Sequence, residues 1–300
     1  MARTVTVGLD GSRESVAAAQ WAAHEALRRR LPLRLVHVWE WEPTTRTPLV
    51  GPETQRHWAE RIPRETADEL RVLFPELEIT SEQLAGQPAA VLSVAAEEAE
   101  LLVMGSRGLS GVAGFLVGSV AQAVVATAER PVVLVRAGEM EEDEHRPDAD
   151  GSPSETTPYR DVVLGLDTDR PSEALIEFAF DAAARRAAAL RVIHGWSLPP
   201  AYGYAPGAMD PTLSEDLATD EASTLTETLR AWREKFPGVE VSEHAVIGQA
   251  ARHLIEAASD ASLVVVGRRA RRLSIGTHIG PVTHAVLHHS PAPVAVVPHD

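Results

Sequence analysis

Glycines at a fixed spacing form the clearest chemical pattern in this sequence. Gly105 and Gly108 are followed, after nine further residues, by Gly118 and Ser119. Such glycines permit positive φ angles and let backbone amides approach an anion closely. A helical pattern begins at Ser119, the expected N-cap, and a helix N-terminus is a good binding site for phosphate groups. Because Arg107 adds a positive charge beside them, these residues predict a phosphate-binding loop.

Two other groups of residues lie where strands are expected to end. Asp10 closes the apolar run that contains Gly8. It suits either the cap of the following helix or a carboxylate near a sugar hydroxyl or a bound cation. His37 closes a second run and is expected to be buried and hydrogen-bonded rather than a metal ligand, because no second histidine lies at metal spacing nearby. The backbone of Val38 then offers N–H and C=O groups that can read an adenine edge.

The elements that must position these groups follow from hydrophobic periodicity. In the first half of the chain, strands are expected near 4–9, 33–39, 77–84, 101–104 and 131–135, and helices near 13–30, 55–73, 88–99 and 119–129. Strands that alternate with helices predict a parallel sheet with helices on both faces. Such a sheet binds ligands at the carboxyl ends of its strands, where the strand order reverses. The three groups of residues follow strands at that edge.

The same pattern occurs twice in the chain. Asp167 and His194 repeat Asp10 and His37 at an offset of 157 residues, and Gly267 repeats Gly105 at an offset of 162. We therefore predict two tandem Rossmann-like α/β domains, each with a five-stranded parallel sheet and helices on both faces. The expected domains cover residues 1–138 and 159–300.

The segment between the two copies, residues 139–158, is acidic, contains proline and has almost no large apolar residue. This composition predicts a disordered linker. It serves either as a solvated spacer or as an acidic docking segment.

Composition excludes several classes of function. The chain has 28 basic and 43 acidic side chains and a net charge of −15, which argues against nucleic-acid binding. The single lysine, Lys235, is not placed for a Walker-type loop or for pyridoxal chemistry. There is no cysteine, and no apolar run is long enough for a signal peptide or a membrane span. A cytoplasmic protein is therefore expected, with no membrane partner.

Taken together, these motifs resemble the universal stress protein family. Its signature is Gly, two residues, Gly, nine residues, Gly, and then Ser or Thr, and the first copy has it complete. The family's Asp after the first strand and its His-Val pair at the end of the second are also present, and the resemblance covers both copies. It implies an α/β protein that binds ATP, with or without Mg²⁺, and regulates survival under stress rather than metabolic chemistry.

The resemblance also implies roles for single residues of the first copy. Asp10 would meet the ribose, and the main chain of Val38 would hold the adenine. The residues expected around the phosphates are Met104, Gly105, Gly108, Gly118, Ser119 and Val120.

The second copy departs from this pattern. Ala270 stands in place of the second glycine, and Pro281 follows Gly280 where Ser or Thr is expected. Ala270 adopts a positive φ only at a cost of about 1 kcal/mol, and Pro281 lacks a backbone donor. Four arginines cluster there instead. They form a solvated basic face, an altered anion site or an internal cationic substitute for the ligand. The cluster and the remaining candidate positions are Arg268, Arg269, Arg271, Arg272, Asp167, Gly267 and Gly280.

Three functions remain open on these grounds. The first is a nucleotide-binding regulator with little turnover and no catalytic residue. The second is a slow ATPase or nucleotidyl-transfer enzyme, against which stands the lack of a lysine placed to cradle the leaving phosphates. The third is an interaction module that binds no ligand. The protein partner is unknown in all three.

The sequence also bears on assembly and on metal binding. The final strands, 132–135 and 294–297, are apolar edges with nothing following to cover them. The two copies are therefore expected to pair as an intramolecular pseudo-dimer, and a homodimer remains open. No metal site is expected at His288 and His289, whose charges suit a helix end.

Overall fold

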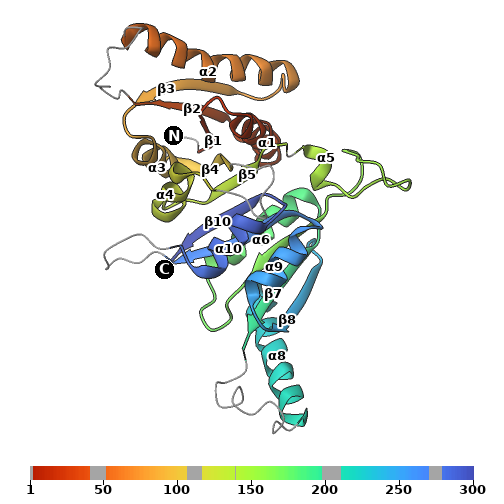
Figure 1. The fold of residues 1–300 in the computed structure, drawn as a ribbon. Coiled ribbons are helices and arrows are strands. Elements are labelled where there is room, and N and C mark those ends of the chain that lie inside the picture. The colour runs from red at the N-terminus through yellow and green to blue at the C-terminus, as the bar shows by residue number, and fades with distance from the viewer. Residues whose placement is uncertain (1–2, 41–51, 107–116, 139, 198–210, 270–278) are drawn as a thin grey trace. The chain divides into compact units, whose positions relative to one another are not determined.

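The computed structural model describes residues 3–40, 52–106, 117–138, 140–197, 211–269 and 279–300. The chain divides into two compact units, the first built mainly from residues 1–141 and the second mainly from residues 142–300 (Figure 1). Each unit is an α/β fold around its own parallel sheet. In the part of the chain that the structure describes, no helix is long and apolar enough to cross a membrane.

The first unit alternates strands and helices as its sequence predicts. Its sheet has the order β3-β2-β1-β4-β5. Helices α1 and α2 pack on one face, and α3 and α4 pack on the other (Figure 1). The bounds are β1 Thr4–Leu9, α1 Arg13–Arg29, β2 Leu33–Trp39, α2 Pro52–Leu73, β3 Ile79–Ala85, α3 Pro88–Glu97, β4 Ala99–Ser106, α4 Ser119–Thr127 and β5 Val132–Arg136.

The second unit repeats this arrangement. Its sheet has the order β10-β9-β6-β7-β8, with α6 and α8 on one face and α9 and α10 on the other. The bounds are β6 Asp161–Gly165, α6 Glu173–Arg186, β7 Leu190–Trp196, α8 Pro211–Lys235, β8 Val241–Ile247, α9 Ala250–Ala258, β9 Ala261–Arg269, α10 Pro281–His289 and β10 Val294–His299. The prediction of two tandem parallel α/β domains is confirmed.

Burial on both faces explains the composition of the central strands. Leu101, Leu102 and Val103 of β4 are all fully buried, although successive side chains of a strand point to opposite faces. A strand covered by helices on both sides has no solvent face, and it therefore reads as a continuous apolar run. Strands β3 and β8 are less buried and carry polar residues among their apolar ones.

Part of the segment between the copies has regular structure. It begins with a short helix, α5, over Glu141–Glu144. Glu141 lies 2.6 Å from Arg28 of α1, and the fully buried Glu144 lies 3.5 Å from the fully buried Arg186 of α6. Residues 141–144 are therefore helical and ion-paired, and disorder of the 139–158 linker as a whole stays a prediction. Its acidic side chains have arginine partners on helices that are distant in sequence, and local composition does not reveal them.

Candidate functional site

Strand register places three predicted residues at one edge of the first sheet. Leu9 is in register with His37 across β1 and β2, and Gly8 is in register with Met104 across β1 and β4. Asp10 and Val38 are therefore level with each other at the carboxyl ends of β1 and β2, and Gly105 of β4 lies one register position earlier, level with Leu9 and His37. Neighbouring strands lie about 4.8 Å apart. The structure thus gathers on one edge residues that are far apart in the sequence.

The backbone of Val38 extends past the end of its neighbour β1. The carbonyl oxygen of Trp39 accepts from Gly86 N–H at 3.1 Å, on the β3 side, and Val5 N–H donates to the Pro32 carbonyl at 3.0 Å, on the β1 side. Backbone groups alternate between the two sides along a strand, so those of Val38 face the β1 side. Strand β1 ends at Leu9, one register position earlier.

His37 is a buried structural histidine, as expected. Its Nδ1 donates to the carbonyl oxygen of Leu9 at 2.8 Å. This bond fastens the end of β2 to the end of β1. His37 therefore fixes the positions of its neighbours Val38 and Asp10 at the edge of the sheet.

Asp10 is not itself the N-cap of α1 but is hydrogen-bonded to the residue that is. Its Oδ1 accepts from the backbone N–H of Ser12 at 3.0 Å and from the Ser12 hydroxyl at 2.5 Å. Ser12 is the N-cap of α1 and accepts in turn from Ser15 N–H. Gly11, with a φ of 80°, makes the turn between them. The side chain of Asp10 is exposed to solvent at the carboxyl edge of the sheet.

Gly105 is required by packing rather than by a left-handed backbone. A Cβ atom at this position would lie 2.6 Å from the carbonyl carbon of Glu14 and 2.8 Å from the backbone nitrogen of Ser15. The expected positive φ at Gly105 is not found, whereas Gly11 has one. The end of β4 therefore touches the first turn of α1. Gly8, in β1, similarly leaves room for Leu92 of α3.

The N-terminus of α4 differs by one residue from the sequence prediction. Gly118, not Ser119, is the N-cap, with extended backbone angles and no side-chain hydrogen bond to the helix. Ser119 and Val120 are the first residues of the helix, so their N–H groups are among the donors that lack helical partners. Arg107 and Gly108 lie outside the described residues.

In the second unit, Arg269 lies beside Asp167, the aspartate that repeats Asp10. The guanidinium of Arg269, at the end of β9, lies 2.6 Å from a carboxylate oxygen of Asp167. Strands β6 and β9 are parallel neighbours, as β1 and β4 are. The buried His194 again donates through Nδ1 to the end of the first strand, at Leu166, and its Nε2 lies 3.3 Å from the Glu221 carboxylate.

The space beside Gly267 is also occupied by side chains of the second unit. A Cβ on this residue would lie 2.6 Å from Nε2 of His299, and Thr283 of α10 donates to the Gly267 carbonyl at 2.7 Å. Gly280 caps α10, and Pro281 at the first helical position has no N–H to offer. The carboxyl edge of the second sheet is therefore occupied by side chains of its own unit.

Comparisons with known proteins agree with this architecture. The model of the universal stress protein family matches residues 1–136 and 158–298. A universal stress protein of Mycobacterium tuberculosis is 34% identical over 97% of this chain and 96% of its own. The chain belongs to the universal stress protein family. The resemblance in the glycine motif is thus confirmed, and both copies are universal stress units.

Solved structures share the fold. A universal stress protein from Archaeoglobus fulgidus matches 99% of this chain and 98% of its own with a TM-score of 0.68 and 19% identity. A single-unit universal stress protein solved in complex with cAMP is 28% identical over 46% of this chain and 98% of its own, with a TM-score of 0.35.

Sequence reasoning missed two residues of this universal stress protein's second unit. Arg269 was placed in a cluster without a partner, and His299 was not considered at all. One alternative left open by the sequence was a cation of the chain itself in place of the ligand. In the structure, the guanidinium of Arg269 is such a cation, and it pairs with Asp167. Arg268 is buried rather than part of a solvated face. Ala270, Arg271 and Arg272 lie outside the described residues.

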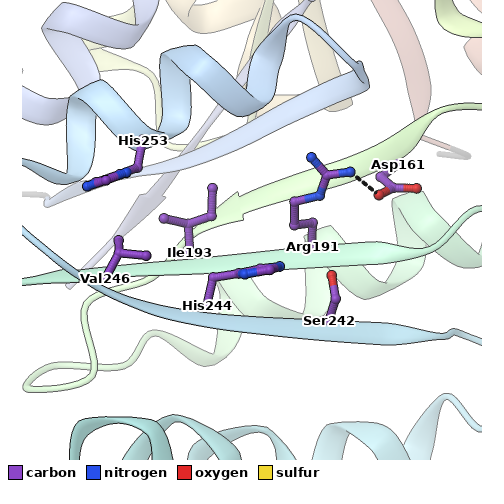
Figure 2. Close-up of a pocket in the computed structure, with 7 residues that line it drawn as sticks. All are labelled: Asp161, Arg191, Ile193, Ser242, His244, Val246 and His253. Carbon is purple, nitrogen blue, oxygen red and sulfur yellow. Dashed lines mark hydrogen bonds and ion pairs between the residues drawn. The ribbon is translucent and has the colours of Figure 1, made fainter. Parts of the chain in front are cut away.

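A separate groove of about 420 Å³ lies on the face of the second sheet, away from its carboxyl edge. Figure 2 shows Arg191 of β7 reaching across it to Asp161 of β6, at 2.6 Å. His244 of β8 stands where the first copy has Glu82, which pairs with Arg34. The groove runs along strands β6 to β8, so it is distinct from the site that the glycine motif predicts.

Proposed function

We propose that this universal stress protein binds an adenine nucleotide, ATP in particular, at the carboxyl edge of its first unit and acts as a regulator with little turnover. The observation that carries this proposal is the register of β2, β1 and β4. It brings a backbone edge at Val38 level with a carboxylate at Asp10, with the glycine Gly105 one register position earlier on the neighbouring strand. These are the three kinds of group that an adenine, a ribose and a phosphate chain require in turn.

Each group has a definite role in this proposal. The main chain of Val38 faces the side that β1 has vacated and pairs with the adenine edge. The Asp10 carboxylate accepts from a ribose hydroxyl, and Ser12, which donates to the same carboxylate, holds it in place. The phosphates lie against the N-terminus of α4 at Ser119 and Val120, where no side chain caps the helix. Met104, Gly105, Arg107, Gly108 and Gly118 complete the predicted phosphate site.

Low turnover follows from the residues at this edge. Lys235, the single lysine, pairs with Glu177 in the second unit, 2.6 Å away, so it is not part of the proposed phosphate site. The Asp10 carboxylate already accepts two hydrogen bonds from Ser12. A carboxylate engaged in this way is better suited to fixing the ribose than to accepting a proton from water.

The second unit is proposed to hold no nucleotide. An incoming ribose would have to displace Arg269 from Asp167, and a phosphate would have to displace His299 from the space over Gly267. The first residue of α10 offers no N–H because it is Pro281. The chain as a whole should therefore bind one nucleotide.

The two aspartates provide a matched test. Asp10→Ala should weaken ATP binding roughly tenfold to a hundredfold, because it removes hydrogen bonds to a charged group. Asp167→Ala, the same change at the repeated position, should leave the affinity as it is. Isothermal titration calorimetry of both variants measures affinity and stoichiometry together. Equal loss in both variants, or two nucleotides per wild-type chain, would contradict the assignment of the site to the first unit.

Two further measurements separate the alternatives. Mass spectrometry of protein purified without added nucleotide should find adenine nucleotide, whereas an interaction module without a ligand would carry none. A turnover assay with ATP and Mg²⁺ should show hydrolysis far slower than a typical enzyme, whose turnover numbers are about 1–1,000 per second. Faster hydrolysis that is lost in Asp10→Ala would favour the ATPase alternative.

A further inference from the structure

The groove on the face of the second sheet has no part in the proposed nucleotide site. It lies between helix α9 and strand β8 and has a volume of about 420 Å³, which suits a small organic molecule (Figure 2). Alternate side chains of a strand share a face, and three of β8, Ser242, His244 and Val246, line the groove. His253 of α9 lies on the helix side, and the buried Ile193 of β7 lies between the two.

Arg191 brings a cation with unused donors to this groove. Its Nη2 donates to Asp161 at 2.6 Å and lies 3.9 Å from a carboxylate oxygen of Asp260. Among the residues that the structure describes, neither its Nε nor its Nη1 donates to an acceptor. A guanidinium has five N–H donors. The side chain of Arg191 is 27% exposed, so a ligand from solvent can reach the donors that remain.

The first copy shows which partner the Nε donor can have. Arg34, the counterpart of Arg191, donates through Nε to Glu82 and through Nη1 to Glu98 at 3.0 Å. His244 has the same register position on β8 that Glu82 has on β3. The Nε donor therefore has a carboxylate partner in the first copy, and the second copy keeps the arginine but has a histidine in place of that carboxylate.

Two further polar side chains lie beside Arg191. Ser242 is in register with Arg191, and His244 is in register with Ile193, the next residue on the same face of β7. Within the described part of the chain, neither the Ser242 hydroxyl nor the His244 ring has a hydrogen bond or an ion pair. Both side chains can donate to an anion. Ile193 and Val246 continue the groove with apolar surface, so it is polar at one end and apolar at the other.

We propose that this groove binds a small organic anion, namely a carboxylate that carries a short apolar group. The carboxylate takes the place of the glutamate side chain of the first copy and accepts a charge-assisted hydrogen bond from Nε of Arg191. Ser242 and His244 donate to its remaining lone pairs. The apolar group covers Ile193 and Val246. The inference does not depend on nucleotide binding in the first unit.

Asp161 and the proposed anion can share one guanidinium. Asp161 bonds to Nη2, whereas the anion bonds to Nε. Asp260 is 69% exposed, so solvent screens its charge. In the first copy, Arg34 already holds two carboxylates, those of Glu82 and Glu98. An arginine of this strand therefore accommodates a second carboxylate.

The test uses the full chain without nucleotide and with benzoate as the probe, followed through the backbone amide resonances of β7 and β8. Benzoate should shift these resonances to saturation. Benzamide, its neutral analogue, should bind roughly tenfold more weakly, because a hydrogen bond to a charged group is stronger than one to a neutral group. Ser242→Ala, which changes no charge, should weaken benzoate binding roughly twofold to tenfold.

A charge substitution tests the comparison between the copies. His244→Glu should weaken benzoate binding roughly tenfold or more, because the new carboxylate bonds to Nε of Arg191 and repels the anion. His284→Glu makes the same change at an exposed position of α10, which packs on β9 and β10. This matched control should bind benzoate as the wild type does.

Three outcomes would overturn the proposal. The first is equal benzoate affinity in the wild type and in His244→Glu. The second is equal affinity for benzoate and benzamide, which would leave the carboxylate without a role. The third is the absence of saturable shifts in β7 and β8 of the wild type. His244 is exposed, so His244→Glu should fold normally, and circular dichroism checks this.

Discussion

The guanidinium of Arg269 lies 2.6 Å from the carboxylate of Asp167, the residue that repeats Asp10 in the second unit. In the first unit, Asp10 accepts from Ser12 at the start of α1. The corresponding turn after Asp167 is longer, since α6 is capped by Ser172, five residues further along the chain. The same motif is therefore followed by turns of different length in the two copies, and in the second copy its aspartate pairs with Arg269.

Breaking this ion pair should have little effect on stability. The two side chains are 43% and 51% exposed, and exposed pairs contribute about 0–1 kcal/mol. We expect Arg269→Ala to change the free energy of unfolding by less than about 1 kcal/mol in urea titrations. The same variant should still bind one nucleotide per chain, since His299 and Pro281 remain. A second nucleotide in this variant would show that Arg269 alone closes the second unit.

Gly105 and Gly267 should respond differently to alanine. The new Cβ of Gly105→Ala would meet backbone atoms of Glu14 and Ser15, which cannot move without displacing α1. We expect a loss of about 1–3 kcal/mol in the free energy of unfolding. In Gly267→Ala the closest group is the His299 ring, which is a side chain and can rotate away without moving the backbone. Its loss should stay below about 1 kcal/mol, and chemical denaturation of both variants provides the comparison.

Glu144 should be among the most sensitive residues between the two copies. Glu144 and Arg186 are both fully buried, and removing one member of a buried pair typically costs about 3–5 kcal/mol. Glu177→Ala, which breaks the exposed pair with Lys235, is the control and should cost about 0–1 kcal/mol. Thermal unfolding of both variants tests this. A Glu144→Ala protein as stable as the control would favour the interpretation of residues 139–158 as a linker without structure.

Glycine should stabilise the end of α6. Ala187, the C-cap, has a φ of 49°, in the left-handed region that costs a residue with a side chain roughly 1–2 kcal/mol. Ala187→Gly removes that strain and should raise the free energy of unfolding by about 0.5–1 kcal/mol after the greater flexibility of the unfolded chain is deducted. Ala184→Gly, inside the same helix, should instead lower it by about 1 kcal/mol. Differential scanning calorimetry distinguishes a rise from a fall.

The sequence by itself determined the elements and the edge of the sheet where the candidate site lies. Strands at 4–9 and 33–39 were predicted at their observed bounds, because apolar runs and helical periodicity are local properties. The glycine motif and the repeated Asp and His could also be recognised in the sequence, because a repeat is found by comparing one half of the chain with the other. The N-cap of α4 was misplaced by one residue because Gly118 and Ser119 are both acceptable caps.

Only the tertiary structure decided which side chains meet. Gly105 contacts Glu14 because register and helix packing bring β4 against the first turn of α1. Arg269 reaches Asp167 across 102 positions of sequence, and periodicity contains no information about such a pair. The reason is physical. Local patterns fix backbone conformation, whereas partners at a sheet edge depend on strand order and register, which arise when the whole core packs.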